Sequence, residues 1–187
     1  MSKIKNNPLL NTVSGMLGDT VVYRKVRGQM QMVNRPARGR KFSEKQEAVK
    51  FRFQEATQYA RQQLAQEESR ALYESRITEQ KHTAHVVAVA DYLNAPKVHF
   101  IETADYVGNV GDTILVKATD DFMVTGVKIV ITDSDGNVLE KGDAVPDDKV
   151  NCWKYVATVA NASLKGTKIQ AIAFDRPGNK TAMEQVL

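Results

Sequence analysis

The sequence predicts an α+β chain of three parts: an N-terminal β-hairpin arm (1–41), a short helical segment (42–96) and a C-terminal β-sandwich (97–187). Two short runs before residue 35 are β-branched or alternate with period two, as strands do. Apolar residues then recur every three to four positions, which is the period of an amphipathic helix. After residue 96, short β-branched runs return with turn-forming residues between them.

The arm contains two candidate strands. Residues 14–19 are turn-prone and precede 20–23, a β-branched and aromatic run typical of a strand. Residues 25–28 can turn the chain, and 29–33 alternate polar and apolar side chains. An isolated two-stranded hairpin is marginally stable in water, so we expect this one to lie on another surface. Residues 34–41, which contain proline and glycine, predict an extended linker.

Positive charge is concentrated in this arm. Residues 1–41 contain nine lysines and arginines and a single acid, Asp19, whereas the rest of the chain carries a net negative charge. Such an arm favours docking to a large anionic partner, either nucleic acid or an acidic protein surface. Tyr23 is its only aromatic residue, so any nucleic-acid contact would be to the phosphate backbone. The expected contact residues are Tyr23, Arg24, Lys25, Arg27, Arg35, Arg38, Arg40 and Lys41.

A capping box predicts where the first helix begins. Ser43 and Gln46 have the spacing at which each side chain bonds the backbone N–H of the other. The following residues place five apolar side chains on one helical stripe, which we expect to be packed. These are Val49, Phe53, Ala56, Ala60 and Leu64.

Two shorter helices are predicted next. One begins near residue 67 or 69 and carries Leu72, Tyr73 and Ile77. The other covers residues 83–93 and ends before a proline, which disfavours helical geometry in the residue before it. The valines at 86, 87 and 89 leave a strand open as the alternative, although the alanines between them favour a helix.

Short strands separated by turn signals predict the sandwich. Their spacing is typical of an immunoglobulin-like β-sandwich. The expected strands are 98–101, 113–118, 127–131, 153–159 and 168–174, with turns at 108–112, 133–137, 146–148 and 176–179.

Residues 97–187 contain four short motifs that are found together in a known family of domains. The motifs are Ala118-Thr119-Asp120-Asp121 before a valine-rich strand, Asp133-x-Asp135-Gly136, Trp153-x-Tyr155, and Ala173-Phe174-Asp175-x-Pro177-Gly178-Asn179. With them, residues 97–187 resemble the immunoglobulin-like modules of bacteria and phages. The resemblance implies that the last motif is a structural turn before the final strand, with no catalytic role. The paired cysteines of antibody domains are absent, so the resemblance is not to those.

Residues 11–53 carry a second resemblance. The turn Ser14-Gly15-Met16-Leu17-Gly18, a Val/Tyr strand, a strand with glycine, an Arg/Pro linker and a helix with Gln46, Arg52 and Phe53 follow one another. This order is similar to the opening of virion-associated structural proteins of Bacteroidetes-type bacteria and their phages, including crAss-like phages. It implies an assembly component of a ring, neck, tail or head. It also implies contact with other particle proteins, and a location in the virion or in the host cytoplasm during assembly. Because an arm that reaches from one subunit to the next generates closed rings, we expect a homo-oligomer such as a ring.

The residue types that carry most catalytic and metal chemistry are sparse. His82 and His85 have one-turn spacing but lack a third ligand, so we expect surface histidines. Asp133 and Asp135 are similar to the start of a calcium loop, yet the required glutamate is replaced by Ala144, so we expect a tight turn. We therefore expect no enzyme, no cofactor and no metal. The alternatives are a nucleic-acid-binding accessory protein and an adhesin that uses the sandwich.

The composition of the chain limits the remaining classes of protein to which it could belong. The chain is 42% hydrophobic and 26% charged, which is ordinary for a globular protein. No apolar run approaches the roughly 18 residues of a membrane span, and the N-terminus lacks the apolar stretch of a secretory signal. We expect no membrane partner. Cys152 is the only cysteine, which excludes an internal disulfide.

Overall fold

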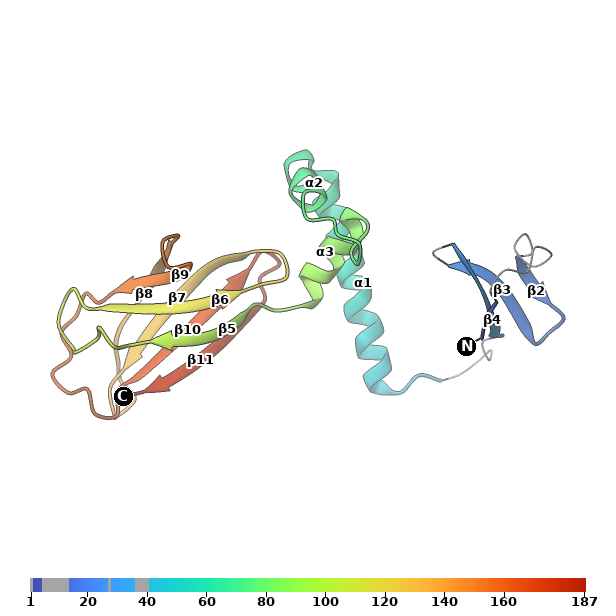
Figure 1. Ribbon diagram of the computed structural model, residues 1–187. Coiled ribbons are helices and arrows are strands. Elements are labelled where there is room, and N and C mark those ends of the chain that lie inside the picture. The colour runs from blue at the N-terminus through green and yellow to red at the C-terminus, as the bar shows by residue number, and fades with distance from the viewer. Residues whose placement is uncertain (1, 5–13, 27, 36–40) are drawn as a thin grey trace. The chain divides into compact units, whose positions relative to one another are not determined.

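The computed structural model describes residues 2–4, 14–26, 28–35 and 41–187. The chain forms two compact units, residues 1–47 and 48–187 (Figure 1). The first holds a four-stranded antiparallel sheet, and the second holds a seven-stranded antiparallel sheet together with the helices. The helical segment and the large sheet therefore belong to one compact body.

The sheet of the first unit is larger than the sequence suggested. Its strands are β1 (Ser2–Ile4), β2 (Gly15–Leu17), β3 (Val21–Val26) and β4 (Gln29–Asn34), in the order β1-β4-β3-β2. The expected hairpin is the central β3–β4 pair. The expectation of only two strands is wrong, because β2 lies within the stretch taken for a turn and β1 adds to β4. Three or more strands are what a small sheet needs for stability.

The three expected helices are present, although the second ends at Glu74, so the expectation that it carries Ile77 is wrong. The helices are α1 (Glu44–Ala65), α2 (Glu67–Glu74) and α3 (Ala84–Leu93). The capping box is confirmed: the Ser43 N–H donates to Gln46 Oε1 at 3.1 Å, and the Gln46 N–H lies 3.4 Å from Ser43 Oγ. The side chain of Thr83 caps α3 by accepting from the Val86 N–H at 3.2 Å, so the strand alternative is wrong.

The apolar stripe of α1 is packed only in its second half. Ala56 and Ala60 are fully buried beside Tyr73 of α2 and residues of α3. Val49 and Phe53 continue the same stripe but are 71% and 52% exposed. The expectation that they are packed is wrong, because the packing partners α2 and α3 lie against the later turns of α1 (Figure 1).

The large sheet contains the five strands whose ranges were expected there and two more, β8 and β11. Its order is β11-β10-β7-β8-β9-β6-β5, with all neighbours antiparallel. Strand β8 runs through the expected turn at 146–148, and the chain turns at 148–151 instead. The seven strands are β5 (Lys97–Glu102), β6 (Thr113–Thr119), β7 (Val124–Thr132), β8 (Val138–Asp147), β9 (Cys152–Val156), β10 (Lys168–Asp175) and β11 (Lys180–Val186).

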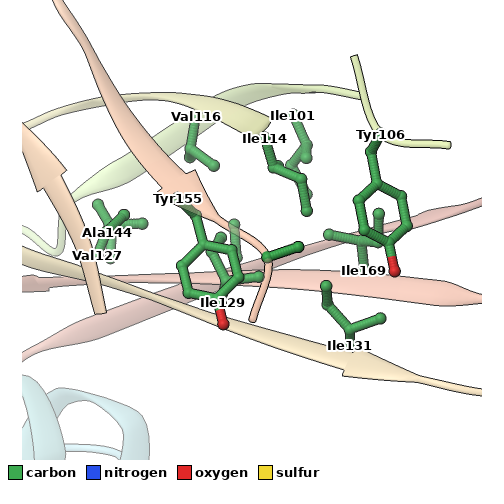
Figure 2. Packing of buried hydrophobic residues seen from close by; sticks show 13 residues of the cluster. Ile101, Tyr106, Ile114, Val116, Val127, Ile129, Ile131, Ala144, Tyr155 and Ile169 are labelled. Carbon is green, nitrogen blue, oxygen red and sulfur yellow. The ribbon is translucent and has the colours of Figure 1, made fainter. Parts of the chain in front are cut away.

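Strand β8 divides this sheet into two layers. It pairs with β7 as far as Ala144 and with β9 from Val145 onward. Side chains from both layers meet in one core, which Figure 2 shows from close by. The core residues alternate along β7 (Val127, Ile129, Ile131) and along β10 (Ile169, Ala171, Ala173). The result is an antiparallel fold that is sandwich-like or barrel-like, with the core between its layers.

Candidate functional site

The structure places five of the eight expected contact residues. Tyr23, Arg24 and Lys25 lie on β3, with Tyr23 half-buried and the two cations exposed. Arg35 follows β4 and is half-buried, and Lys41 is exposed. Arg27, Arg38 and Arg40 lie outside the described residues.

Arg24 and Lys25 belong to opposite faces of the sheet. Residues opposite each other on paired strands share a face, and successive residues alternate between faces. Lys25 pairs with Met30, which is 4% exposed, whereas Arg24 pairs with Gln31. The sequence therefore concentrates charge in the arm, but β3 divides that charge between two faces.

Arg35 is held within the sheet. Its guanidinium donates to the Asp19 carboxylate, and its N–H donates to the Thr20 carbonyl at 2.8 Å. These contacts tie the end of β4 to the turn between β2 and β3. Arg35 thus binds the single acid of the arm, which makes it a structural residue. An exposed pair of this kind contributes roughly 0–1 kcal/mol.

Strand β2 is an apolar edge. Among the described residues its strand partner is β3, and its other side pairs with none of them. Met16 and Leu17 are 56% and 65% exposed, and the strand contains neither a charge nor a proline. Charges and prolines are the usual protection of a sheet edge against pairing with another chain. Sequence reasoning missed this strand, because the flanking Gly15 and Gly18 indicated a turn.

The acidic turn between β7 and β8 has a structural role. The Asp133 carboxylate accepts from the Asp135 N–H at 2.9 Å and from the Asn137 N–H at 2.8 Å. The hydrogen bonds from Asn137 hold the pKa of Asp133 below its usual value. The expected tight turn is confirmed. In the part of the chain that the structure describes, no group of three or more His, Cys, Asp or Glu side chains is placed to hold a metal ion.

The second unit has a cavity of about 640 Å³ beside β8 and β9. Tyr155, Val145 and Val156 supply apolar surface to it. The lining also includes three lysines and three aspartates, so the two signs of charge balance: Lys141, Lys149, Lys154, Asp143, Asp147 and Asp148. The lining of this cavity contains no histidine and no cysteine.

No protein-family model, curated protein or solved structure matches this chain. None of the helices in the described ranges is both long enough and apolar enough to cross a bilayer.

Proposed function

We propose that this chain is a non-enzymatic structural protein of a phage-like particle, and that its N-terminal sheet docks to a neighbouring subunit. The observation that carries the proposal is the apolar edge of β2, which pairs on one side with none of the described residues and exposes Met16 and Leu17. Its partners are further copies of the chain, in a closed assembly such as a ring, and other proteins of the particle.

Strand addition is the mode of docking that this edge favours. The backbone groups of an edge strand can pair with a strand of another chain, and exposed side chains then set the specificity. Strand β2 is short, so pairing alone would be weak. Met16 and Leu17 add apolar surface on the two faces of the strand, which helps to hold a partner. An arm that reaches from one subunit to the next generates rings when the rotation closes.

The second unit would supply the body of such a subunit. The order β11-β10-β7 in one layer and β9-β6-β5 in the other, with β8 passing between them, supports an immunoglobulin-like sandwich. Arg176 and Asn179 lie in the turn between β10 and β11 and bond the helices through Ser69 and the Tyr92 carbonyl. These contacts support a structural role for this turn.

The test is the mass in solution of the full chain and of Met16→Lys, which puts a charge on the β2 edge. The matched control is Met123→Lys, since Met123 is also exposed but lies outside the first unit. We expect a discrete oligomer for the parent chain and the control, and a smaller species for Met16→Lys. A parent chain that stays monomeric at every concentration would exclude self-assembly through this edge.

A second function, attachment to nucleic acid, has one observation in its favour: Arg24, Lys25 and Lys41 are exposed. Contacts of such residues to phosphates would be indifferent to base sequence and sensitive to salt. The same mass measurement, repeated with added nucleic acid and after nuclease treatment, separates the two functions. A mass that rises only when nucleic acid is present would favour the second function. With three phosphate contacts, the affinity for nucleic acid should then fall by a factor of about 40 between roughly 50 and 200 mM salt.

A further inference from the structure

A buried polar cluster lies where the three helices meet two loops of the large sheet. Its centre is Asp91 of α3, which is fully buried. The Tyr73 hydroxyl of α2 donates to Asp91 Oδ2 at 2.6 Å and lies 2.9 Å from the Tyr59 hydroxyl of α1. Asp91 Oδ1 is buried and has no hydrogen-bond partner in the described part of the chain. One oxygen of this carboxyl is therefore tightly held, and the other is unsatisfied.

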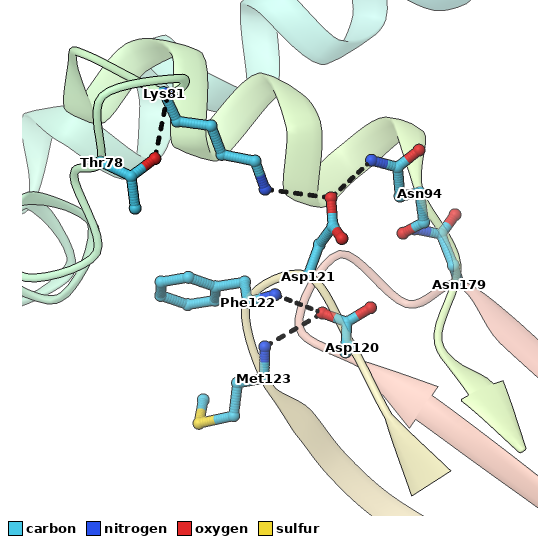
Figure 3. Close-up of polar contacts among 8 residues, drawn as sticks. All are labelled: Thr78, Lys81, Asn94, Asp120, Asp121, Phe122, Met123 and Asn179. Carbon is cyan, nitrogen blue, oxygen red and sulfur yellow. Dashed lines mark hydrogen bonds and ion pairs between the residues drawn. The ribbon is translucent and has the colours of Figure 1, made fainter. Parts of the chain in front are cut away.

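Two further acids lie close enough to act on Asp91. Asp120 follows β6, and its Oδ2 accepts from the Phe122 and Met123 N–H groups at 2.9 and 3.0 Å (Figure 3). Its Oδ1 is also buried without a partner among the described residues. Asp175 ends β10, is 4% exposed, and accepts from the backbone of the turn that follows. Among the described residues, none of these three carboxyls belongs to an ion pair.

Among the described residues, the guanidinium of Arg176 acts on Asp91 and on Tyr59. Arg176 donates to the Ser69 hydroxyl at 2.9 Å, and its guanidinium carbon lies 5.6 Å from the centre of the Tyr73 ring. The contact with Ser69 joins Arg176 to α2, and in the described part of the chain Arg176 forms no ion pair with a carboxylate. The groups that act on Asp91, taken over every element packed around it, are Tyr59 of α1, Tyr73 of α2, Asp120 after β6, and Asp175 and Arg176 at the end of β10.

Three acids and one cation leave an excess of negative charge at a site where Asp91 and Asp175 are buried and the other two groups are half-buried. Desolvation disfavours the ionised form of a buried carboxyl, and like charges nearby add to the effect. Burial first, and then the charges of Asp120 and Asp175, raise the pKa of Asp91 to about 6, against the opposing hydrogen bond from Tyr73. Burial also raises the pKa of Asp175. A bound metal ion could neutralise the charge instead, but the described residues offer no set of ligands for one.

We propose that Asp91 takes up a proton under mildly acidic conditions and that this proton stabilises the packing of the three helices against the large sheet. The proton removes one of the excess charges where the helices meet the β6–β7 and β10–β11 loops. The packing of the helices against the large sheet would then be more stable in acid than at neutral pH. This inference does not depend on the proposed function, because no residue of the first unit takes part.

The sign of the effect follows from linkage. A carboxyl whose pKa is higher in the folded chain than in the unfolded one binds its proton more tightly when folded, so stability falls as the pH rises through that range. With a change from 3.8 to about 6, the folding equilibrium constant should be about 25-fold larger at about pH 4.5 than at about pH 7.5. Asp121 and Asp133 have lowered pKa values, so the stability that they contribute is lost as the pH falls. Their effect on stability is opposite in sign to that of Asp91 and occurs at lower pH.

The test is the urea unfolding of the full chain at about pH 4.5 and about pH 7.5, for the parent and for Asp91→Asn. Asparagine has the shape of the protonated carboxyl, so the variant should lose most of the pH dependence and gain stability at neutral pH. Asp105→Asn is the matched control, since Asp105 is exposed. We expect it to keep the parent's pH dependence.

A second measurement, made on the parent chain, tests the proposal even if Asp91→Asn folds poorly. Carbon NMR of the Asp91 carboxyl in the parent chain should give a titration midpoint near pH 6. A midpoint at or below the ordinary aspartate value, or a parent chain less stable at the acidic pH, would overturn the proposal. So would a neutral-pH stabilisation by added calcium that Asp91→Asn abolishes, because a cation would then fill the role assigned to the proton.

Discussion

Glu140 of β8 gives the sharpest prediction on the fold of the second unit. Its side chain is 7% exposed, and Oε2 accepts four hydrogen bonds. The donors are the Tyr155 hydroxyl at 3.1 Å, the Thr158 N–H and hydroxyl, both at 2.8 Å, and the Val159 N–H at 3.2 Å. One carboxylate therefore fixes the chain where it leaves β9.

Glu140→Ala would leave two hydroxyls, those of Tyr155 and Thr158, and two backbone N–H groups without their acceptor. Each unsatisfied buried group costs roughly 1–3 kcal/mol, and water can reach the partly buried ones, so the low end applies to them. We expect a loss of about 3 kcal/mol in the free energy of unfolding. That is a large part of the roughly 5–15 kcal/mol that stabilises a typical domain. With a urea m-value of about 2 kcal/mol per molar, the midpoint should fall by about 1.5 M.

The assay is urea unfolding followed by the fluorescence of Trp153, the only tryptophan, which lies on β9. Glu102→Ala is the control, because Glu102 is exposed and accepts one bond, from the Ala104 N–H at 3.2 Å. The control should stay within about 0.5 kcal/mol of the parent. Glu140→Gln keeps an acceptor oxygen and should fall between the two. A Glu140→Ala midpoint equal to that of the control would refute the reasoning.

Three other substitutions test separate contacts by the same unfolding assay. Gly142→Ala should cost about 1–3 kcal/mol, because the new methyl carbon would lie 2.7 Å from a ring carbon of Tyr155; Gly126→Ala meets nothing within 4 Å and should not destabilise. Thr83→Ala removes the cap of α3 and should cost about 1 kcal/mol. Tyr73→Phe removes the donor to a buried carboxyl and should cost about 2 kcal/mol at neutral pH and less in acid. Equal midpoints for the two alanine-for-glycine variants, or no loss in either of the others, would contradict the corresponding contact.

Helix boundaries could be predicted because their signals are local. Ser43 and Thr83 cap helices through residues three positions away, so a short window of sequence contains the whole contact. The packing of α1 could not be predicted in the same way. The stripe continues from Ala56 back to Val49, and only the tertiary arrangement decides which part of it has a partner.

Two of the strands that sequence reasoning missed lack the usual strand composition. Strand β8 contains Gly142 and Pro146, which normally break strands. Gly142 is required there because Tyr155 occupies the space that a side chain would need. Strand β2 has glycine at its first residue and just after its last. In both cases the strand is imposed by its neighbours and not by its own residues.

The candidate sites were visible in sequence only in part. The division of Arg24 and Lys25 between two faces follows from the period of a strand and could have been predicted. The pairing of Arg35 with Asp19 joins residues 16 apart and has no local signal. Asp91 had one usable signal, as the only acid in the mostly apolar helix α3. Its partners come from distant parts of the chain, so the charge imbalance around it could not be predicted.

The most direct test of the assembly proposal is amide hydrogen exchange in β2, measured on dilute and on concentrated samples of the full chain. If a neighbouring chain covers this edge, the outward-facing amides of Gly15–Leu17 should gain protection as the concentration rises, and Met16→Lys should abolish that gain. Exchange of these amides that stays fast at every concentration would show that the edge remains open and would contradict the proposed docking.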